Sequence, residues 1–210
     1  MKLYINRIFL TLCICWLWQS LFLPQSLTCC KHAENCKHPN CFECSFESEI
    51  ENNYPPHIDS ALAYVGYNKH DNKATILEWL KSVNIDSYAA WCAAFVRSML
   101  DKGGAIEPKT RSGLAQRYID KKAIPAILVL RGKAKVGTGW LAIWKKGNTW
   151  KGHIGFVVWW LFGEGETIEG NTTINRNGNQ RMGGYVALKK RKIQPYSYFR
   201  ITHFRRVCYD

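Results

Sequence analysis

Residues 88–96 of the chain read Tyr88-Ala89-Ala90-Trp91-Cys92-Ala93-Ala94-Phe95-Val96. This apolar run predicts a buried helix over residues 89–102, and Asp86-Ser87 just before it are good N-cap residues. Cys92 is therefore expected near the start of a helix. A thiol, with a pKa of about 8.5, becomes a useful nucleophile only when a helix N-terminus and a nearby imidazolium stabilise the thiolate. Cys92 is our candidate nucleophile.

The candidate partners of Cys92 lie far downstream. His153 opens the apolar strand pattern Gly152-His153-Ile154-Gly155-Phe156-Val157-Val158. Glu169 follows 16 residues later (169 − 153), a spacing that fits a strand, a turn around residues 163–165 and an antiparallel return strand. Such a hairpin brings Glu169 back to His153, where it holds the second ring nitrogen. Asn171 points to the same side if the strand continues, and orients the histidine or donates a hydrogen bond at the site.

Each of these residues also has a purely structural interpretation. A cysteine among alanines on an apolar helix, such as Cys92, is usually a small buried hydrophobe. A histidine between glycine and isoleucine, such as His153, is usually an ordinary strand residue. The ordered set of four, with each member in the secondary structure that its role requires, is what favours a catalytic interpretation.

From His57 onward the sequence predicts helices first and strands afterwards. Helices are expected over residues 59–67, 73–83, 89–102 and 112–122. Strands are expected over residues 126–130, 141–145, 153–161, 166–169, 184–190 and 198–206. This order predicts an α+β fold with N-terminal helices packed on an antiparallel β-sheet. The sequence shows no internal repeat and no phosphate-binding glycine motif.

The same motifs carry a family resemblance, which spans roughly residues 57–192. They are Trp91-Cys92-Ala93-Ala94-Phe95-Val96, the strand Leu141-Ala142-Ile143-Trp144 before Gly152-His153-Ile154-Gly155-Phe156-Val157, and Glu169-Gly170-Asn171. Together they resemble the CHAP family of cysteine, histidine-dependent amidohydrolases and peptidases. The resemblance implies a papain-like (NlpC/P60-type) fold that cleaves amide bonds in peptidoglycan.

The resemblance also implies a role for each candidate residue. Cys92 is the nucleophile, His153 the base, and Glu169 and Asn171 the orienting groups. No cofactor is implied, and the acidic calcium loop of some members is not apparent, so the sequence gives no basis for a metal. Where family members often have Gly-Asp-Ile before the histidine strand, this chain has Gly139-Trp140-Leu141, which we interpret as an altered groove shape.

The N-terminus has the layout of an export signal. Lys2 and Arg7 precede an apolar run over residues 8–18, which Leu21-Phe22-Leu23 extend. Residues 1–28 are therefore either a signal peptide or a membrane anchor: about 20 apolar residues are needed to span a bilayer, and Gln19-Ser20 interrupt this run. Leu27-Thr28-Cys29-Cys30 resembles a bacterial lipobox with Cys30 as the lipidated residue. The alternative is an ordinary signal peptide whose neighbouring cysteines form disulfides.

Residues 29–56 form a polar linker before the catalytic domain, which is expected over residues 57–210. The linker holds five cysteines and two histidines: Cys29, Cys30, Cys36, Cys41, Cys44, His32 and His38. A zinc knuckle needs a second cysteine pair at standard spacing, which is missing here. An exported location favours disulfides or a flexible tether over zinc.

Positive charge is concentrated in the strand-rich half of the chain. Residues 121–210 contain 17 Lys and Arg against 4 Asp and Glu, so this half carries +13 (17 − 4), equal to the net charge of the whole protein. In an exported protein such a face favours anionic cell-envelope polymers and lipid headgroups as partners. No nucleic-acid-binding motif accompanies the charge. The run of residues 189–192, taken alone, predicts a solvated basic surface.

The sequence thus predicts an exported, membrane-tethered peptidoglycan hydrolase. It has 47% hydrophobic residues in 210, enough for one ordinary core. Two alternatives stay open: a non-catalytic envelope or wall-binding module that keeps this fold, and a phage lysin that its membrane segment holds inactive. The sequence does not choose between N-acetylmuramoyl-L-alanine amidase and cross-bridge endopeptidase.

Overall fold

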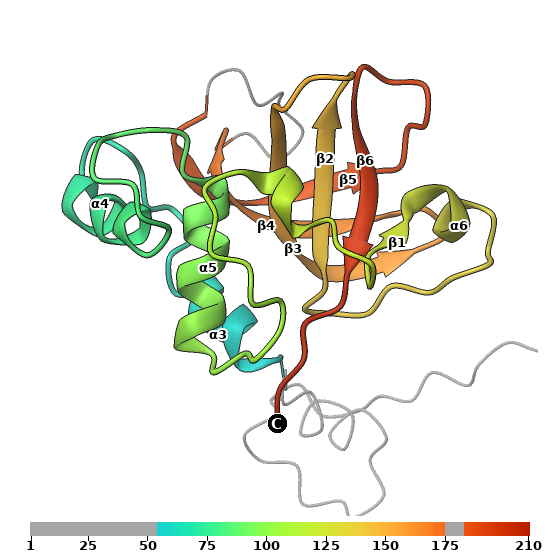
Figure 1. Cartoon of the computed structure of the whole chain (residues 1–210), viewed down its shortest axis with the longest axis horizontal. Coiled ribbons are helices and arrows are strands. Elements are labelled where there is room, and N and C mark those ends of the chain that lie inside the picture. The colour runs from blue at the N-terminus through green and yellow to red at the C-terminus, as the bar shows by residue number, and fades with distance from the viewer. Residues whose placement is uncertain (1–53, 175–182) are drawn as a thin grey trace, which may run out of the picture. The chain divides into compact units, whose positions relative to one another are not determined.

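The computed structural model of the chain describes residues 54–174 and 183–210. Helices come first along this part of the chain: α3 (Pro56–Leu62), α4 (Lys73–Lys81) and α5 (Cys92–Lys102). Helix α5 is buried on all sides from Cys92 to Leu100, because it packs against α3, α4 and two strands of the sheet. It is the central helix of the fold (Figure 1).

Six strands form one antiparallel sheet. They are β1 (Ile124–Pro125), β2 (Leu141–Lys146), β3 (Gly152–Leu161), β4 (Glu164–Thr172), β5 (Tyr185–Lys192) and β6 (Phe199–Arg205). The strand order is β1-β6-β2-β3-β4-β5, so the last strand of the chain lies between β1 and β2. Helices and an antiparallel sheet confirm the predicted α+β class.

Helices cover both faces of the sheet. Alternate residues of a strand point to opposite faces, and on β2 the residues Leu141 and Ile143 join the core that contains α5, whereas Ala142 and Trp144 join a second core. The second core includes Ala126 and further side chains of the short helix α6 (Ala126–Leu130). Figure 1 shows α5 and α6 on either side of the central strands.

The prediction of a strand over residues 126–130 is wrong, because this segment is α6. Its burial follows a helical spacing: Ala126 and Val129 are buried, whereas Ile127 and Leu130 are partly exposed. Pro125 before it pairs only as the end of the two-residue edge strand β1. The apolar composition suited either structure, and packing against the second core selected the helix.

The prediction of a helix over residues 112–122 is also wrong in extent. Only a short 3-10 helix, η2 (Ala115–Tyr118), forms there. Tyr118 is fully buried, and its hydroxyl donates to the carbonyl oxygen of Ala93 in α5 at 3.5 Å. Just beyond, Asp120 accepts hydrogen bonds from Arg205 of β6. These tertiary contacts fix the chain in an irregular path.

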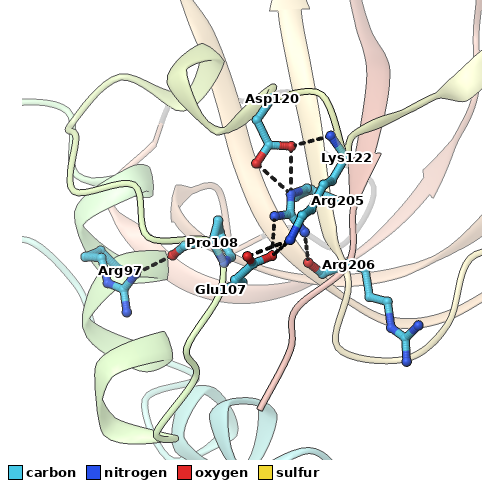
Figure 2. A network of polar contacts seen from close by, with 7 residues as sticks. All are labelled: Arg97, Glu107, Pro108, Asp120, Lys122, Arg205 and Arg206. Atoms are coloured by element: carbon cyan, nitrogen blue, oxygen red, sulfur yellow. Dashed lines mark hydrogen bonds and ion pairs between the residues drawn. The ribbon is translucent and has the colours of Figure 1, made fainter. Parts of the chain in front are cut away.

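Figure 2 shows the ion-pair network that holds this path against β6. The guanidinium of Arg205, which is almost fully buried, donates to Asp120 from Nε at 2.9 and 3.0 Å and to Glu107 from Nη2 at 3.0 Å. Lys122 Nζ also donates to Glu107. Nearby, Arg97 of α5 donates to the carbonyl oxygen of Pro108 at 2.7 Å. The long connection between α5 and β1 is thereby fixed at both ends.

The predicted signal or anchor over residues 1–28, with the candidate lipidated Cys30, lies outside the described residues. So does the cysteine-rich linker, except for its last residues 54–56. Among the helices that the structure describes, none combines the length and apolarity required to cross a membrane.

Candidate active site

Cys92 is the first residue of α5, and its side chain is buried with 6% exposure. The expectation that Asp86-Ser87 cap this helix is wrong: Trp91 occupies the N-cap position and no side-chain cap is formed. The sulfur is nevertheless at the helix N-terminus, where the N–H groups of the first turn lack acceptors within the helix and carry partial positive charge.

A glycine allows α5 to approach β4 closely. A Cβ placed on Gly170 would lie 2.7 Å from Cβ of Phe95 and 2.8 Å from Cζ3 of Trp91. Both contacted residues belong to the start of α5, beside Cys92. Gly170 therefore sets how closely the start of α5 approaches β4, and it stands between the two polar candidates Glu169 and Asn171.

Replacing Gly170 by alanine should push the start of α5 away from β4. Overpacking of this kind costs about 1–3 kcal/mol of stability, and a shift of a reacting group by about 1 Å can lower a rate about 100-fold. We expect a urea midpoint slightly below that of the wild type and a much larger loss of any Cys92-dependent hydrolysis. Gly137→Ala is the matched control, since its Cβ meets only the Trp140 side chain, at 3.2 Å. Equal effects of both substitutions would contradict the positioning role.

His153 is the second residue of β3 and is almost fully buried. Its Nε2 is 2.9 Å from Oε2 of Glu169, which leaves Nδ1 for another partner, and Cys92 is close enough to the ring to influence its pKa. Trp144, the cross-strand neighbour on β2, contacts the imidazole edge-on with 5.3 Å between ring centroids. The ring is therefore held from three sides.

Glu169 is completely buried on β4 and is the hub of the site. Besides His153, its carboxylate accepts hydrogen bonds from Thr167 Oγ1 at 2.7 Å and from Arg191 Nε and Nη2 at 2.6 and 2.5 Å. Gly155 on β3 makes room for it, because a Cβ there would lie 2.7 Å from Cγ of Glu169. The predicted hairpin, which turns at Phe162-Gly163, thus brings Glu169 to His153.

The electrostatics favour a charged histidine and a charged glutamate. Burial works against protonation of His153, but the neighbouring Cys92 and Glu169, through charge and hydrogen bonds, raise its pKa to about 9. Burial would likewise raise the pKa of Glu169, yet hydrogen bonds from Arg191 and the charge of His153 hold that pKa well below its ordinary value. At neutral pH the site therefore contains an imidazolium beside the sulfur of Cys92.

Asn171 does not occupy the position that the sequence predicted. The β4–β5 register shifts between Glu169 and Thr172, and Asn171 adopts a left-handed backbone with φ of 55°. Asparagine tolerates this conformation better than most residues. The register shift and the left-handed backbone interrupt the strand alternation on which the prediction depended, and among the described residues no hydrogen bond joins Asn171 to His153. The orienting role of Asn171 stays a prediction.

The structure adds Arg191 and Trp144, which the sequence reasoning did not select. Arg191 donates two hydrogen bonds to Glu169, and its guanidinium lies over the ring of Trp144 at 5.6 Å. Strand alternation offered a signal for Arg191, because it places residues 189 and 191 on one face of the sheet and residues 190 and 192 on the other. The partner of Arg191 depends on the β4–β5 register, which the sequence does not contain.

The prediction that residues 189–192 are a solvated basic surface is wrong for two of the four. Lys189 is fully buried and its Nζ donates to Oγ1 of Thr173 at 2.9 Å. Burial, and then the charge of Arg191, lower the pKa of Lys189. Arg191 is committed to Glu169, whereas Lys190 and Lys192 are exposed.

Among residues 54–174 and 183–210, no group of three or more His, Cys, Asp and Glu side chains is arranged to hold a metal ion. Both cysteines in these ranges, Cys92 and Cys208, are free thiols. Comparison of the chain with protein-family models, curated proteins and solved structures finds no match in any of the three.

Proposed function

We propose that the protein is a cysteine hydrolase that cleaves amide bonds. The observation that carries this proposal is the buried series Cys92, His153 and Glu169, in which Glu169 binds Nε2 of the histidine and Cys92 is close enough to the ring to raise its pKa. A merely structural cysteine needs no such imidazolium, and a merely structural histidine needs no carboxylate that is itself held by an arginine.

The chemistry follows from these contacts. His153 in its protonated form stabilises the Cys92 thiolate, which attacks the carbonyl carbon of the amide. The proton of His153 then passes to the leaving nitrogen, the C–N bond breaks and a thioester remains on Cys92. A water molecule, deprotonated by His153, attacks the thioester, and the acid product leaves as the thiol sulfur departs. Glu169 fixes the imidazole and stabilises its positive charge throughout.

The start of α5 also supplies groups for the oxyanion. The first N–H groups of a helix have no intrahelical acceptor, and the helix dipole places partial positive charge there. Because Cys92 is the first residue of α5, a carbonyl bound to its sulfur has its oxygen within reach of this helix terminus. This arrangement stabilises the tetrahedral intermediate without a metal.

For the substrate we propose peptidoglycan, and for the fold a papain-like arrangement of the central helix against the sheet. The resemblance of the sequence motifs supports both, and the +13 carried by residues 121–210 suits an anionic polymer. The direct experiment is mass spectrometry of fragments released from purified peptidoglycan. Amidase cleavage leaves a free lactyl carboxylate on the glycan and a free amino group on L-alanine, whereas endopeptidase cleavage leaves new amino and carboxyl groups within the peptides. Intact peptidoglycan after prolonged incubation with the folded protein would favour the non-catalytic wall-binding module.

The rate of hydrolysis should fall as the pH rises through about 9. The pKa of His153 is raised to about 9, so the proton that the leaving amine requires is present below that pH and lost above it. The stability that the charged His153 contributes changes with pH in the same direction as the activity. It is complete below about pH 6.5, the ordinary pKa of a histidine, and disappears as the pH rises through about 9. Profiles of kcat/KM and of the urea midpoint between pH 6 and 10.5 test both. A loss of activity centred near pH 6.5 would contradict the ion pair between His153 and Glu169.

We propose that the protein acts outside the cytosol, held at the membrane by its first thirty residues, since the N-terminal sequence has an export layout with a lipobox-like end. Cys30→Ala should then release the protein from the membrane fraction and abolish labelling with a radioactive fatty acid. The same substitution of Cys29 is the matched control. Unchanged fractionation and no fatty-acid labelling of the wild type would reject the lipoprotein and leave the cleaved signal or simple anchor.

A further inference from the structure

A basic pocket lies beside the candidate site on its β5 side. It has a volume of about 340 Å³ and receives side chains from β2, β5 and β6 together with the start of β4. In the sheet order, β5 is separated from β6 by β2, β3 and β4. Two strands that are this far apart can line one pocket only because the sheet curls, so the pocket is a product of the tertiary fold. Its size is that of a site for a small ligand or a substrate group.

The walls of this pocket are strongly cationic. Four basic side chains line it: Lys190, Arg191, Lys192 and Arg200. Glu164 is the one carboxylate in the lining. The remaining lining includes Trp144, Phe199 and Ile201, which supply an apolar wall. Like charges gathered in a concave site with apolar walls repel one another and raise the local potential, which an anion relieves.

Arg191 has one edge of its guanidinium free to bind an anion in this pocket. Its Nε and Nη2 donate to the two oxygens of Glu169, and its plane rests on Trp144. Within the described part of the chain no acceptor binds its Nη1, while Arg191 itself lines the pocket. A guanidinium has five N–H donors in a fixed plane, so a second oxyanion can bind at the free edge while Glu169 keeps the first.

We propose that this pocket is a binding site for an oxyanion, a carboxylate or a phosphate, carried by the polymer that the protein cleaves. The anion accepts from Nη1 of Arg191 and is attracted by Lys192 and Arg200. Trp144 forms a wall of the pocket and also contacts His153. The polymer that carries the bound anion therefore extends from the pocket to Cys92. The anion site deepens the proposed hydrolase function, and only the source of the anion depends on that function.

Binding of the anion is measured directly, without any turnover. Inorganic phosphate and acetate are titrated separately into the full chain carrying Cys92→Ser, with potassium chloride adjusted to keep the ionic strength constant. The readout is the NMR signal of the Arg191 Nε–H group, which Arg191→Lys identifies by its disappearance. We expect a saturable shift, and the tighter of the two anions indicates whether a phosphate or a carboxylate is the natural group.

The pocket residues are then tested against a matched surface lysine. The double substitution Lys192→Gln with Arg200→Gln should weaken anion binding about tenfold, since each removes a charge that attracts the ligand. Lys133→Gln removes an exposed lysine outside the pocket and should leave binding unchanged. A linear, unsaturable shift, or equal weakening by Lys133→Gln, would show a general salt effect and overturn the site.

A kinetic measurement separates failure of this site from failure of the proposed function. If peptidoglycan fragments are hydrolysed, the double substitution should raise KM about tenfold and leave kcat within about twofold, because its members do not touch the reacting atoms. A fall in kcat with an unchanged KM would overturn the anion site and leave the hydrolase intact. Saturable phosphate binding by a chain that cleaves no amide would retain the site and reject only its link to catalysis.

Discussion

Replacing Cys92 by serine is expected to abolish hydrolysis of peptidoglycan while the protein stays folded. In the proposed mechanism the nucleophile is a thiolate, and a serine hydroxyl does not ionise to replace it. Loss of the nucleophile in a triad-like enzyme lowers kcat by about four to six decades. The substitution keeps the size of the side chain, so the thermal midpoint should change little. Release of soluble fragments from purified sacculi gives the rate, and circular dichroism gives the midpoint.

Cys208, the other cysteine of the described residues, supplies the control. Cys208→Ser should keep full activity, because Cys208 is not part of the candidate site and lies in the C-terminal segment, where its backbone pairs with Glu107. Alkylation by iodoacetamide at pH 6 tests independently whether the imidazolium of His153 activates the sulfur of Cys92. Exposure alone favours reaction at Cys208, which is less buried than Cys92, whereas an imidazolium beside the sulfur favours Cys92. Normal hydrolysis by Cys92→Ser would end the enzyme proposal.

His153→Ala extends the test to the partner. Loss of a general acid and base costs about two to four decades in rate. It should also remove the preferential alkylation of Cys92, since no imidazolium remains at the sulfur. Preferential labelling that survives in His153→Ala would show that the helix terminus alone activates the thiol.

The substitution with the largest expected effect on stability is Glu169→Gln. Glu169 is fully buried and is the carboxylate shared by His153 and Arg191. The amide is nearly the same size but has no charge, so two cations lose their counter-ion in a buried site. Removing one partner of a buried ion pair costs about 3–5 kcal/mol. Urea denaturation at pH 7 measures this loss.

Activity should fall about 100- to 1,000-fold in Glu169→Gln without vanishing, since in the proposed mechanism Glu169 orients the base and does not react. The pH profile should move as well: without the carboxylate the pKa of His153 drops, and the loss of activity at high pH begins below pH 9. Glu78→Gln is the matched control, because Glu78 is an exposed carboxylate on α4 that lines neither the site nor the pocket. A variant as stable and as active as Glu78→Gln would show that the buried carboxylate is not needed.

The stability that Glu169 contributes has a defined pH dependence. Its pKa is lower in the folded protein than its ordinary value, so the contribution is complete above about pH 4.3, the ordinary pKa of a glutamate, and is lost as the pH falls below it. The wild type should therefore lose stability on acidification more steeply than Glu169→Gln. Parallel acid titrations of the two proteins would contradict the network.

Local sequence patterns were sufficient for the elements that build the core of the site. Strand alternation and the turn residues after Leu161 determine the β3–β4 hairpin, and the hairpin places Glu169 against His153 because both positions are fixed by one tight turn. The apolar run after Trp91 likewise determines α5, since a segment buried on every side must satisfy its backbone groups internally. These features depend on residues that are close along the chain.

The sequence alone was insufficient wherever a residue depends on a distant partner. Segment 126–130 suits a strand by composition and becomes α6 because of the second core. Asn171 leaves the strand alternation because the register of β4 with β5 shifts there. Arg191 reaches Glu169 across that same register, and Gly170 matters only because Phe95 of α5 packs on it.

The sequence by itself therefore determined an α+β chain with Cys92 at the start of a helix and a hairpin that joins His153 to Glu169. Only the tertiary structure decided that Arg191 holds this carboxylate and that the curled sheet forms a cationic pocket beside it. The physical reason is the range of the interactions. Helical and hairpin periodicity is encoded within a few residues, whereas the charge around a buried group depends on every strand that packs against it.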